Sequence, residues 1–328
     1  MAVTTQTSPP ATSEGDPTTS ATGGGSGSGA VRPSRQRPRP TLGRVLAWAV
    51  LVGIIAITLF PFYWMLRTAF SNGAVLGSDP SSLTPVDPTT GAFERVFGLA
   101  TTEEAQAQGG SGAAIAFPRY LLNSVLVATV ITAGQVVFGA MAAYAFARMR
   151  WPGRDAVFFL FLTALMVPPI FTQLPNFLLM RDLGLLNTYP AIILPFFFMT
   201  PFAIFFLRQF FLGISGEVEE AARLDGAGHV KTFVRIIVPM SWGPITTLAL
   251  LQYVLAWNEY FWPLLVGSAQ DVRVLTVALG VFRSQTPQGT PDWAGLMAAT
   301  LVAALPVLVL FAVFSKKIVN SIGFSGIK

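Results

Sequence analysis

The chain has 328 residues, of which 52% are hydrophobic and only 11% are charged. Because a soluble domain is usually about one quarter charged, this composition favours a protein that contacts lipid. The absence of Cys excludes disulfides and thiolate catalysis, and the single His excludes a histidine cluster around a metal. The net charge of +5 is attributed to the cytoplasmic loops of a membrane protein rather than to a nucleic-acid partner.

Residues 1–40 consist mainly of Ser, Thr, Gly and Pro and end in RPSRQRPRP. This composition cannot bury an apolar core, so we predict a disordered cytoplasmic tail. It is not a secretory signal, because its basic residues follow a long polar stretch and the next apolar run is too long. Its arginines either help to fix orientation as part of a solvated tail or contact anionic lipid headgroups: Arg32, Arg35, Arg37 and Arg39.

Six apolar segments follow, each close to the ~20 residues that span a bilayer as a helix. They lie at residues 44–66, 119–147, 156–179, 189–211, 241–266 and 293–315. We therefore predict an all-α, polytopic membrane protein with six transmembrane helices. Its expected parts are the tail 1–40, a first transmembrane helix 41–66, an external loop 67–118, a five-helix core 119–315 with a cytoplasmic loop at 212–240, and a cytoplasmic C-terminal tail 316–328.

The basic residues are distributed unevenly between the two sides of this arrangement. With the N-terminus inside, 15 of the 21 Lys and Arg residues lie on the cytoplasmic side. The positive-inside rule then predicts that both termini are cytoplasmic. Prolines interrupt the expected spans, either because the helices line a transport pathway or because the kinks serve packing: Pro168, Pro169, Pro175, Pro195, Pro201 and Pro306.

The most polar part of the second half is GEVEEAARLDGAGHVKTFVRIIVPM, residues 216–240. We predict a short helix from Gly216 to Gly226 with Ser215 as its N-cap. Within this helix Glu219 and Arg223 have the i,i+4 spacing of an ion pair. A second amphipathic run, from His229 to Val238, is expected to stop before Pro239. A solvated helical hairpin on the membrane surface is the simplest interpretation of this stretch.

A second candidate site is the aromatic and polar cluster Trp257, Asn258, Glu259 and Tyr260 in the fifth expected span. A carboxylate inside a span costs a few kcal/mol unless it faces protein or water, so Glu259 is a candidate for the substrate pathway. A structural ion pair, a cap on a partner subunit, or an interfacial aromatic belt explains the same residues equally well.

The residues of the polar stretch carry a resemblance. Glu220-Ala221-Ala222, then Gly226, then Ile236, Val238 and Pro239 resembles the E-A-A-x3-G-x9-I-x-L-P signature of permease subunits of ABC importers, with Val in place of the usual Leu. Five neighbouring stretches resemble the maltose-type, carbohydrate-importing branch: NSVLVA from 123, AAYAFARMRWPGR from 142, LGLLNTYPAIILPF from 183, PFAIFFLRQFF from 201 and LAWNEYFWPLL from 255. The resemblance covers roughly residues 44–328. The N-terminal extension and the external stretch TTEEAQAQGGSGAA depart from it, and the latter is expected to be a loose insertion.

The resemblance implies the type I permease fold of ABC importers and a role for the polar stretch as a coupling helix that docks into a separate ATPase. The residues implied in this coupling are Glu220, Ala221, Ala222, Arg223, Asp225, Gly226 and Pro239. It also implies that the C-terminal residues Phe324, Ser325 and Gly326 reach the ATPase dimer, whereas a frayed, inert end is the competing interpretation. The implied partners are a second permease subunit, two ATPase subunits, an external solute-binding protein, a carbohydrate and the lipid bilayer of a bacterial cell membrane.

No Gly-Lys pair occurs in the chain, so the G-x-x-x-x-G-K-[ST] phosphate-binding loop is absent. No H-E-x-x-H or G-x-S-x-G motif is present either. We therefore predict a transport subunit that is not an enzyme and has no cofactor, with ATP and Mg²⁺ on the partner ATPase. The alternatives are a secondary solute transporter, a membrane-embedded enzyme, or an ABC permease for a non-sugar substrate such as a glycerophosphodiester.

Overall fold

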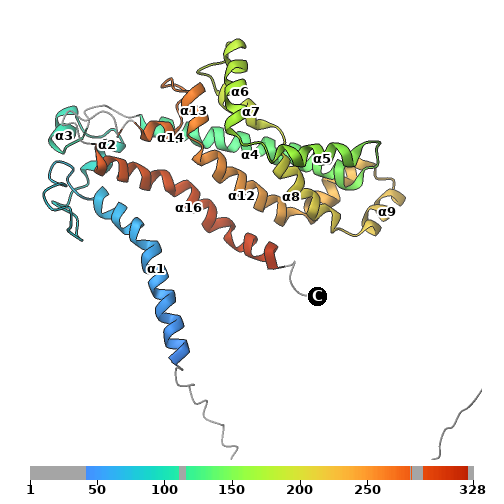
Figure 1. The fold of residues 1–328 in the computed structure, drawn as a ribbon, viewed down its shortest axis with the longest axis horizontal. Helices are drawn as coiled ribbons and strands as arrows, with labels where there is room; N and C mark the ends of the chain where they lie inside the picture. The colour runs from blue at the N-terminus through green and yellow to red at the C-terminus, as the bar shows by residue number, and fades with distance from the viewer. Residues whose placement is uncertain (1–41, 111–115, 281, 283–290, 324–328) are drawn as a thin grey trace, which may run out of the picture. The chain divides into compact units, whose positions relative to one another are not determined.

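The computed structural model describes residues 42–110, 116–280, 282 and 291–323, with side chains as far as Phe314 (Figure 1). Within these ranges all regular elements are helices, and one isolated antiparallel bridge pairs Ser71 with Pro88. The all-α prediction is confirmed. Contacts divide the chain into Met1–Ile54 and Ile55–Lys328, and the described part of the first unit is the beginning of α1 (Leu42–Ala69).

Three described helices are long and apolar enough to cross a membrane: α1, α4 (Phe117–Arg148) and α16 (Trp293–Gly323). Two bent pairs bring the number to five if each pair is one span. They are α7 (Tyr189–Phe197) with α8 (Pro201–Leu212), bent by 41°, and the segment His229–Met240 with α12 (Trp242–Asn258), bent by 80°.

Besides the expected span 189–211, which forms the bent pair α7 and α8, two further expected spans are not continuous helices. Residues 156–179 form α5 (Arg154–Ala164) and α6 (Ile170–Asp182), which are not among the candidate spans of the described chain. Pro168 and Pro169 lie between them, and a proline both lacks the N–H that a helix needs and disfavours helix in the residue before it. The expected span 241–266 is likewise broken into α12 and α13 (Phe261–Val266).

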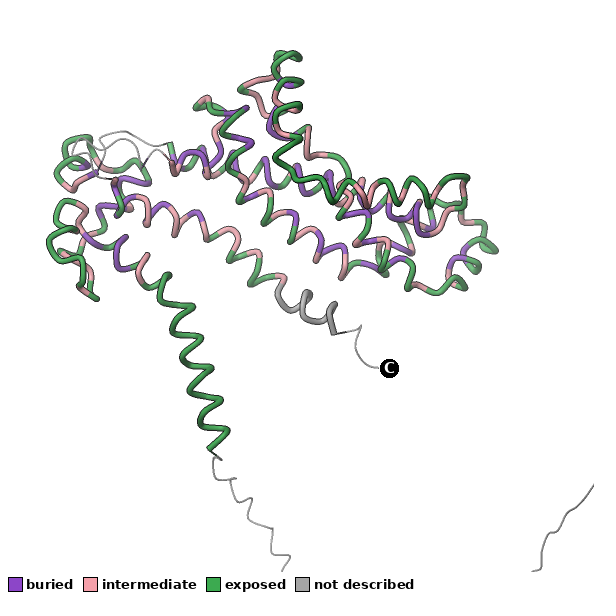
Figure 2. The backbone as a smooth tube through the Cα atoms, viewed as in Figure 1, coloured by how far each residue is buried: buried purple, intermediate pink, exposed green. Residues whose placement is uncertain are grey.

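The core forms where α4 packs against α7, α8 and α12. Gly134 and Gly139 permit the close approach on the α7–α8 side. A Cβ at Gly134 would lie 2.2 Å from the Phe197 carbonyl oxygen, and one at Gly139 would lie 2.9 Å from Ala203 Cβ. Small residues that let helix backbones approach closely are typical of membrane bundles. Figure 2 shows buried residues along these helices, whereas α1 is exposed over most of its length.

The described part of the segment between α1 and α4 contains two short helices, one of them within the stretch that is expected to be a loose insertion. They are α2 (Gly91–Val96) and α3 (Thr102–Ala107), and α3 begins with a reciprocal capping box between Thr101 and Glu104. The sequence-based expectation is therefore wrong for residues 101–110, because local capping chemistry starts a helix there. Residues 111–115 lie outside the described ranges.

Candidate functional site: a polar surface helix and an internal cavity

The polar stretch begins with the expected helix, α9 (Gly216–Leu224). Ser215 Oγ accepts a hydrogen bond from the Glu217 N–H, 3.3 Å away, which confirms Ser215 as the N-cap. The helix ends where Gly226 adopts a φ of +76°, a left-handed conformation that favours glycine. Its terminal hydrogen bonds run from Gly226 N to the Arg223 oxygen and from Ala227 N to the Ala222 oxygen.

α9 has an exposed face and a buried face within this chain. Leu224, which is not part of the expected coupling set, is 90% exposed. The members of that set that are exposed on α9 and its C-terminal turn are Glu220, Ala221, Arg223, Asp225 and Gly226, and Pro239 is exposed further along the chain. Ala222 is 6% exposed, so the chain itself encloses this side chain. The structure therefore does not bring Ala222 to the surface beside Glu220 and Ala221. The exposed face of α9 consists of the other residues, with Leu224 as its largest apolar side chain.

Glu219 lies on the buried face and pairs with a residue outside the helix. Its Oε1 is 3.1 Å from Nε of Arg148, the last residue of α4, so the expected pair with Arg223 is replaced. Arg223 is exposed, whereas Glu219 points inward, where an ion needs a partner. The burial of the Glu219 carboxylate therefore decides its ion-pair partner, and the i,i+4 spacing from Arg223 does not.

The second amphipathic run does not stop before Pro239. It consists of α10 (His229–Thr232), a π-helical turn (Phe233–Ile237) and α11 (Val238–Met240). The expectation is wrong because Pro239 occupies the first turn of α11, where its missing N–H is tolerated. A π turn uses i→i+5 hydrogen bonds and often marks a functional segment of a helix.

An open hollow of about 850 Å³ is lined jointly by residues of α9 and of the end of α4. Its polar lining includes both signs of charge: Arg148, Arg150, Arg154, Glu219, Glu220, Arg223 and His229. This surface lies outside the apolar spans and suits contact with a soluble protein, because mixed charges steer and orient such encounters.

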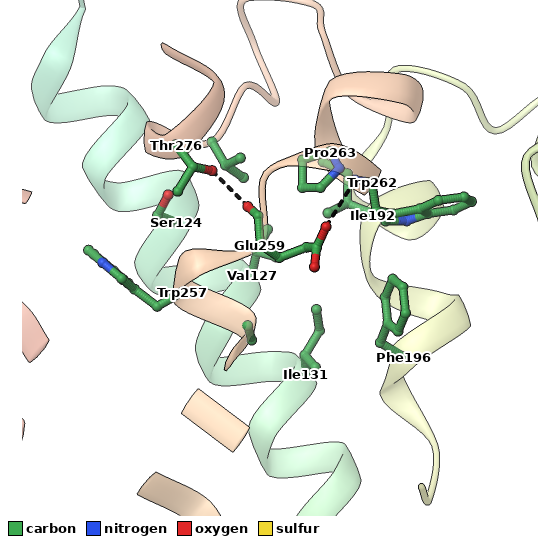
Figure 3. A pocket seen from close by; sticks show the side chains of 12 residues that line it. Ser124, Val127, Ile131, Ile192, Phe196, Trp257, Glu259, Trp262, Pro263 and Thr276 are labelled. Carbon is green, nitrogen blue, oxygen red and sulfur yellow. Dashed lines mark hydrogen bonds between the residues drawn. The ribbon is translucent and has the colours of Figure 1, made fainter. Parts of the chain in front are cut away.

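Glu259 lines an internal cavity of about 20 Å³ between α4, α7, α12, α13 and α14 (Leu275–Leu279) (Figure 3). Its Oε1 accepts a hydrogen bond from the Trp262 N–H, 3.1 Å away, and its backbone oxygen accepts one from the Thr276 hydroxyl at 2.7 Å. In Figure 3 the carboxylate points toward the space bounded by Ile131 and Phe196. Most of the lining is apolar, and the volume is sufficient for about one water molecule.

The other members of the expected pathway cluster face different surroundings. Trp257 borders the same cavity from one side. Asn258 donates to the Val254 backbone oxygen at 2.8 Å and borders a separate hollow beside α16. Tyr260 is 46% exposed. The structure thus joins Glu259 and Trp257 at one cavity and separates Asn258 and Tyr260 from it.

Two polar residues that the sequence analysis did not single out lie close to this cavity. Asn123 on α4 donates to the backbone oxygens of Asp271 and Arg273 at 3.0 and 2.9 Å. The neighbouring Ser124 Oγ accepts from the Leu275 N–H at 2.7 Å. Their sequence signal is that Asn123 and Ser124 are adjacent polar residues at the start of a long apolar run, where polar side chains are uncommon. The expected C-terminal contacts, Phe324, Ser325 and Gly326, lie outside the described residues.

Residues 135–322 match the family described as the inner membrane component of binding-protein-dependent transport systems. The chain is 31% identical to the diacetylchitobiose uptake system permease protein NgcG of Streptomyces coelicolor, over 84% of this chain and 86% of that protein. It is also 31% identical to the sn-glycerol-3-phosphate transport system permease protein UgpE of Agrobacterium fabrum, over 86% of this chain and 96% of that protein.

A solved structure is also similar. The fold matches a chain in the crystal structure of a bacterial ABC transporter involved in the import of the acidic polysaccharide alginate. The TM-score is 0.67 at 25% sequence identity, and the match covers 83% of this chain and 95% of that chain. Taken with the helical fold and the exposed α9, these similarities show that the chain belongs to the binding-protein-dependent transport family. It is a multi-pass inner membrane permease subunit of an ABC importer, whose ATPase is a separate subunit.

Proposed function

We propose that this chain is one of two homologous permease subunits of a carbohydrate importer. An external binding protein delivers the sugar, and two ATPase subunits, which hold ATP and Mg²⁺, supply the energy. Family membership sets aside the secondary-transporter and membrane-enzyme alternatives. The remaining alternative is an ABC permease for a phosphorylated solute, because UgpE belongs to a glycerol-3-phosphate system.

The exposed face of α9 is the observation that carries the coupling role. The E-A-A-x3-G residues form a short helix outside the apolar spans, and its exposed side combines Glu220, Arg223 and the 90% exposed Leu224. A protruding apolar side chain with charges around it has the composition of an interface anchor inside a polar rim. The ATPase is the soluble subunit that this surface would bind.

The single carboxylate in the cavity supports an uncharged sugar over a phosphate ester. Among the described residues that line the cavity, Glu259 is the only ionisable one, and no Arg or Lys accompanies it. A carboxylate in a poorly solvated wall repels an anionic substrate, whereas it accepts hydrogen bonds from sugar hydroxyl groups. The cavity itself is too small for a sugar, so in this proposal the substrate occupies space between this chain and the second permease subunit, and Glu259 acts on it from the wall of that space.

We further propose six membrane spans with both termini in the cytoplasm. Support comes from the basic asymmetry of the sequence and from the broken pair α5 and α6, which together would make the third crossing. Discontinuous helices are common in transporters, where protein or water satisfies the freed backbone groups. α9 then lies on the cytoplasmic side, where the ATPase is found.

Uptake by a deletion strain tests the substrate class. The strain is complemented with the wild-type chain, and uptake of labelled neutral di- and oligosaccharides is compared with uptake of labelled glycerol 3-phosphate. Loss of sugar uptake on deletion and its return on complementation support the proposal. Loss of glycerol 3-phosphate uptake alone would reject the carbohydrate assignment. A strain whose ATPase carries an inactivated nucleotide site is the matched control for energy coupling.

A further inference from the structure

The C-terminal end of α4 is joined to both α8 and α9 by one side chain. Arg148 Nη2 donates to the backbone oxygens of Phe211 and Ile214, and its Nε lies 3.1 Å from Glu219 Oε1. The Arg148 and Glu219 side chains are only 14% and 7% exposed. α8 ends at Leu212, and the last carbonyls of a helix lack partners within it. Arg148 supplies those partners and also neutralises the one buried carboxylate of α9.

The planar guanidinium suits this arrangement because it presents several donors in a fixed geometry. Nε and Oε1 are at ion-pair distance without a well-aligned hydrogen bond, so the attraction between the two groups is mainly Coulombic. Breaking a buried pair by removing one partner leaves an uncompensated charge, which is strongly destabilising. The pair therefore holds the inner face of α9 against the end of α4.

The other end of α4 holds the external segment that follows α13. Asn123 binds the backbone oxygens of Asp271 and Arg273, and Ser124 accepts from the Leu275 N–H. Between Ser124 and Arg148 the helix contains no proline, and this stretch is about 36 Å long at 1.5 Å per residue. A single uninterrupted helix thus has polar anchors at both ends.

We propose that α4 is a rigid mechanical connection between α9 and the external segment 271–275. Arg148 and Glu219 are the positioning residues, because their ion pair couples the position of α4 to that of α9. This inference rests on the proposed docking of α9 on the ATPase. In this arrangement a displacement of α9 by the ATPase moves the end of α4 through the ion pair. The rigid helix carries that displacement to Asn123 and Ser124 and to the wall of the Glu259 cavity, which Ser124 also lines.

Three glutamates of α9 provide a matched test, because each Glu→Gln change removes one charge from a different face. Glu217 and Glu220 are exposed, whereas Glu219 is buried. The complex is purified with its second permease and ATPase subunits and reconstituted in vesicles. The measurements are ATPase retention, basal ATP hydrolysis, and sugar uptake per ATP hydrolysed with loaded binding protein outside.

The Glu219→Gln complex should retain the ATPase and its basal hydrolysis. Its sugar uptake per ATP hydrolysed should fall about tenfold, because a displacement of α9 is no longer transmitted to α4. Glu217→Gln should match the wild type. Glu220→Gln should instead weaken ATPase retention. If Glu220→Gln and Ala221→Trp both leave retention and stimulation normal, the proposed docking of α9 fails. If Glu220→Gln weakens ATPase retention while Glu219→Gln equals the wild type in sugar uptake per ATP, the docking of α9 stands and only the transmission through α4 is rejected.

A spectroscopic measurement separates transmission from simple stabilisation. Gln270 is exposed beside the external segment, so a Gln270→Cys change in this Cys-free chain accepts a fluorophore there. Its emission should change when a non-hydrolysable ATP analogue binds the wild-type complex, and the change should disappear with Glu219→Gln. If Glu219→Gln is absent from the membrane, Arg148→Lys replaces it, since Lys keeps the charge but has a single nitrogen in place of the separate Nη2 and Nε that face the carbonyls and the carboxylate. An undiminished signal in the variant that is assayed overturns the proposal.

Discussion

Arg95 Nη2 on α2 lies 3.1 Å from Asp292 Oδ1 at the start of α16, although the two residues are 197 positions apart in the chain. Their side chains are 5% and 1% exposed. Arg95 Nη1 also donates to Gln108 Oε1 at 2.8 Å, and Asp292 Oδ1 accepts from the Gly295 N–H at 2.7 Å. This small network joins α2 and the end of α3 to the beginning of α16.

Replacing Arg95 by Met should therefore destabilise the purified protein by about 3–5 kcal/mol, because Asp292 is left as a buried, unpaired charge. Thermal unfolding in detergent measures the loss. The double variant Arg95→Met/Asp292→Asn should recover more than half of it, since Asn still accepts from Gly295 without a charge. An unchanged melting temperature for Arg95→Met would show that the pair contributes nothing to stability.

Cysteine labelling should distinguish the two faces of α9. Ala221 is exposed and Ala222 is 6% exposed, so these neighbours form a matched pair in a Cys-free chain. A maleimide should react with Ala221→Cys at least about tenfold faster than with Ala222→Cys, because a reagent reaches buried positions only through local opening. Binding of the ATPase should protect Ala221→Cys. Equal rates at both positions would contradict the described orientation of α9.

Gly226 and Gly228 test the turn after α9. Gly226 has a φ of +76°, whereas Gly228 has a φ of −74°, and a Cβ would meet nothing within 4 Å at either residue. Gly226→Ala should cost about 1–2 kcal/mol through backbone strain alone. Gly228→Ala should be close to neutral. Thermal unfolding and sugar-stimulated ATP hydrolysis would measure the difference. Identical behaviour of the two variants would show that the left-handed turn at Gly226 is not required for stability or coupling.

Glu259 combines a structural contact with a charge, and two substitutions separate them. Gln can still accept from the Trp262 N–H, so Glu259→Gln should assemble normally while it alters the Km or maximal rate of sugar uptake. Glu259→Leu removes the acceptor and should also destabilise the protein by about 1–3 kcal/mol. Uptake kinetics and thermal unfolding are the measurements. If Glu259→Gln transports like the wild type, the carboxylate serves only to hold the start of α13.

The features that were predicted correctly from the sequence depend on residues close together in the chain. Ser215 and Gly226 set the two ends of α9 through local capping and a left-handed turn. The pairs Arg148–Glu219 and Arg95–Asp292 join residues that are far apart, and no local pattern specified either partner. Within α9, burial favoured Arg148 over the nearby Arg223. The interruption of residues 156–179 between α5 and α6 was also predicted, because the adjacent Pro168 and Pro169 are a local signal.

In the proposed coupling, the exposed face of α9 transmits ATPase action to this permease. Ala221→Trp is the most direct test, since Ala222→Trp would disturb the chain's own packing, whereas Ala221 faces outward. Ala156→Trp, at an exposed position on α5, adds the same side chain elsewhere and serves as the control. In purified complexes, Ala221→Trp should lose the ATPase or its stimulation by sugar-loaded binding protein, while Ala156→Trp keeps both. Full retention and normal stimulation in the Ala221→Trp complex would contradict the account.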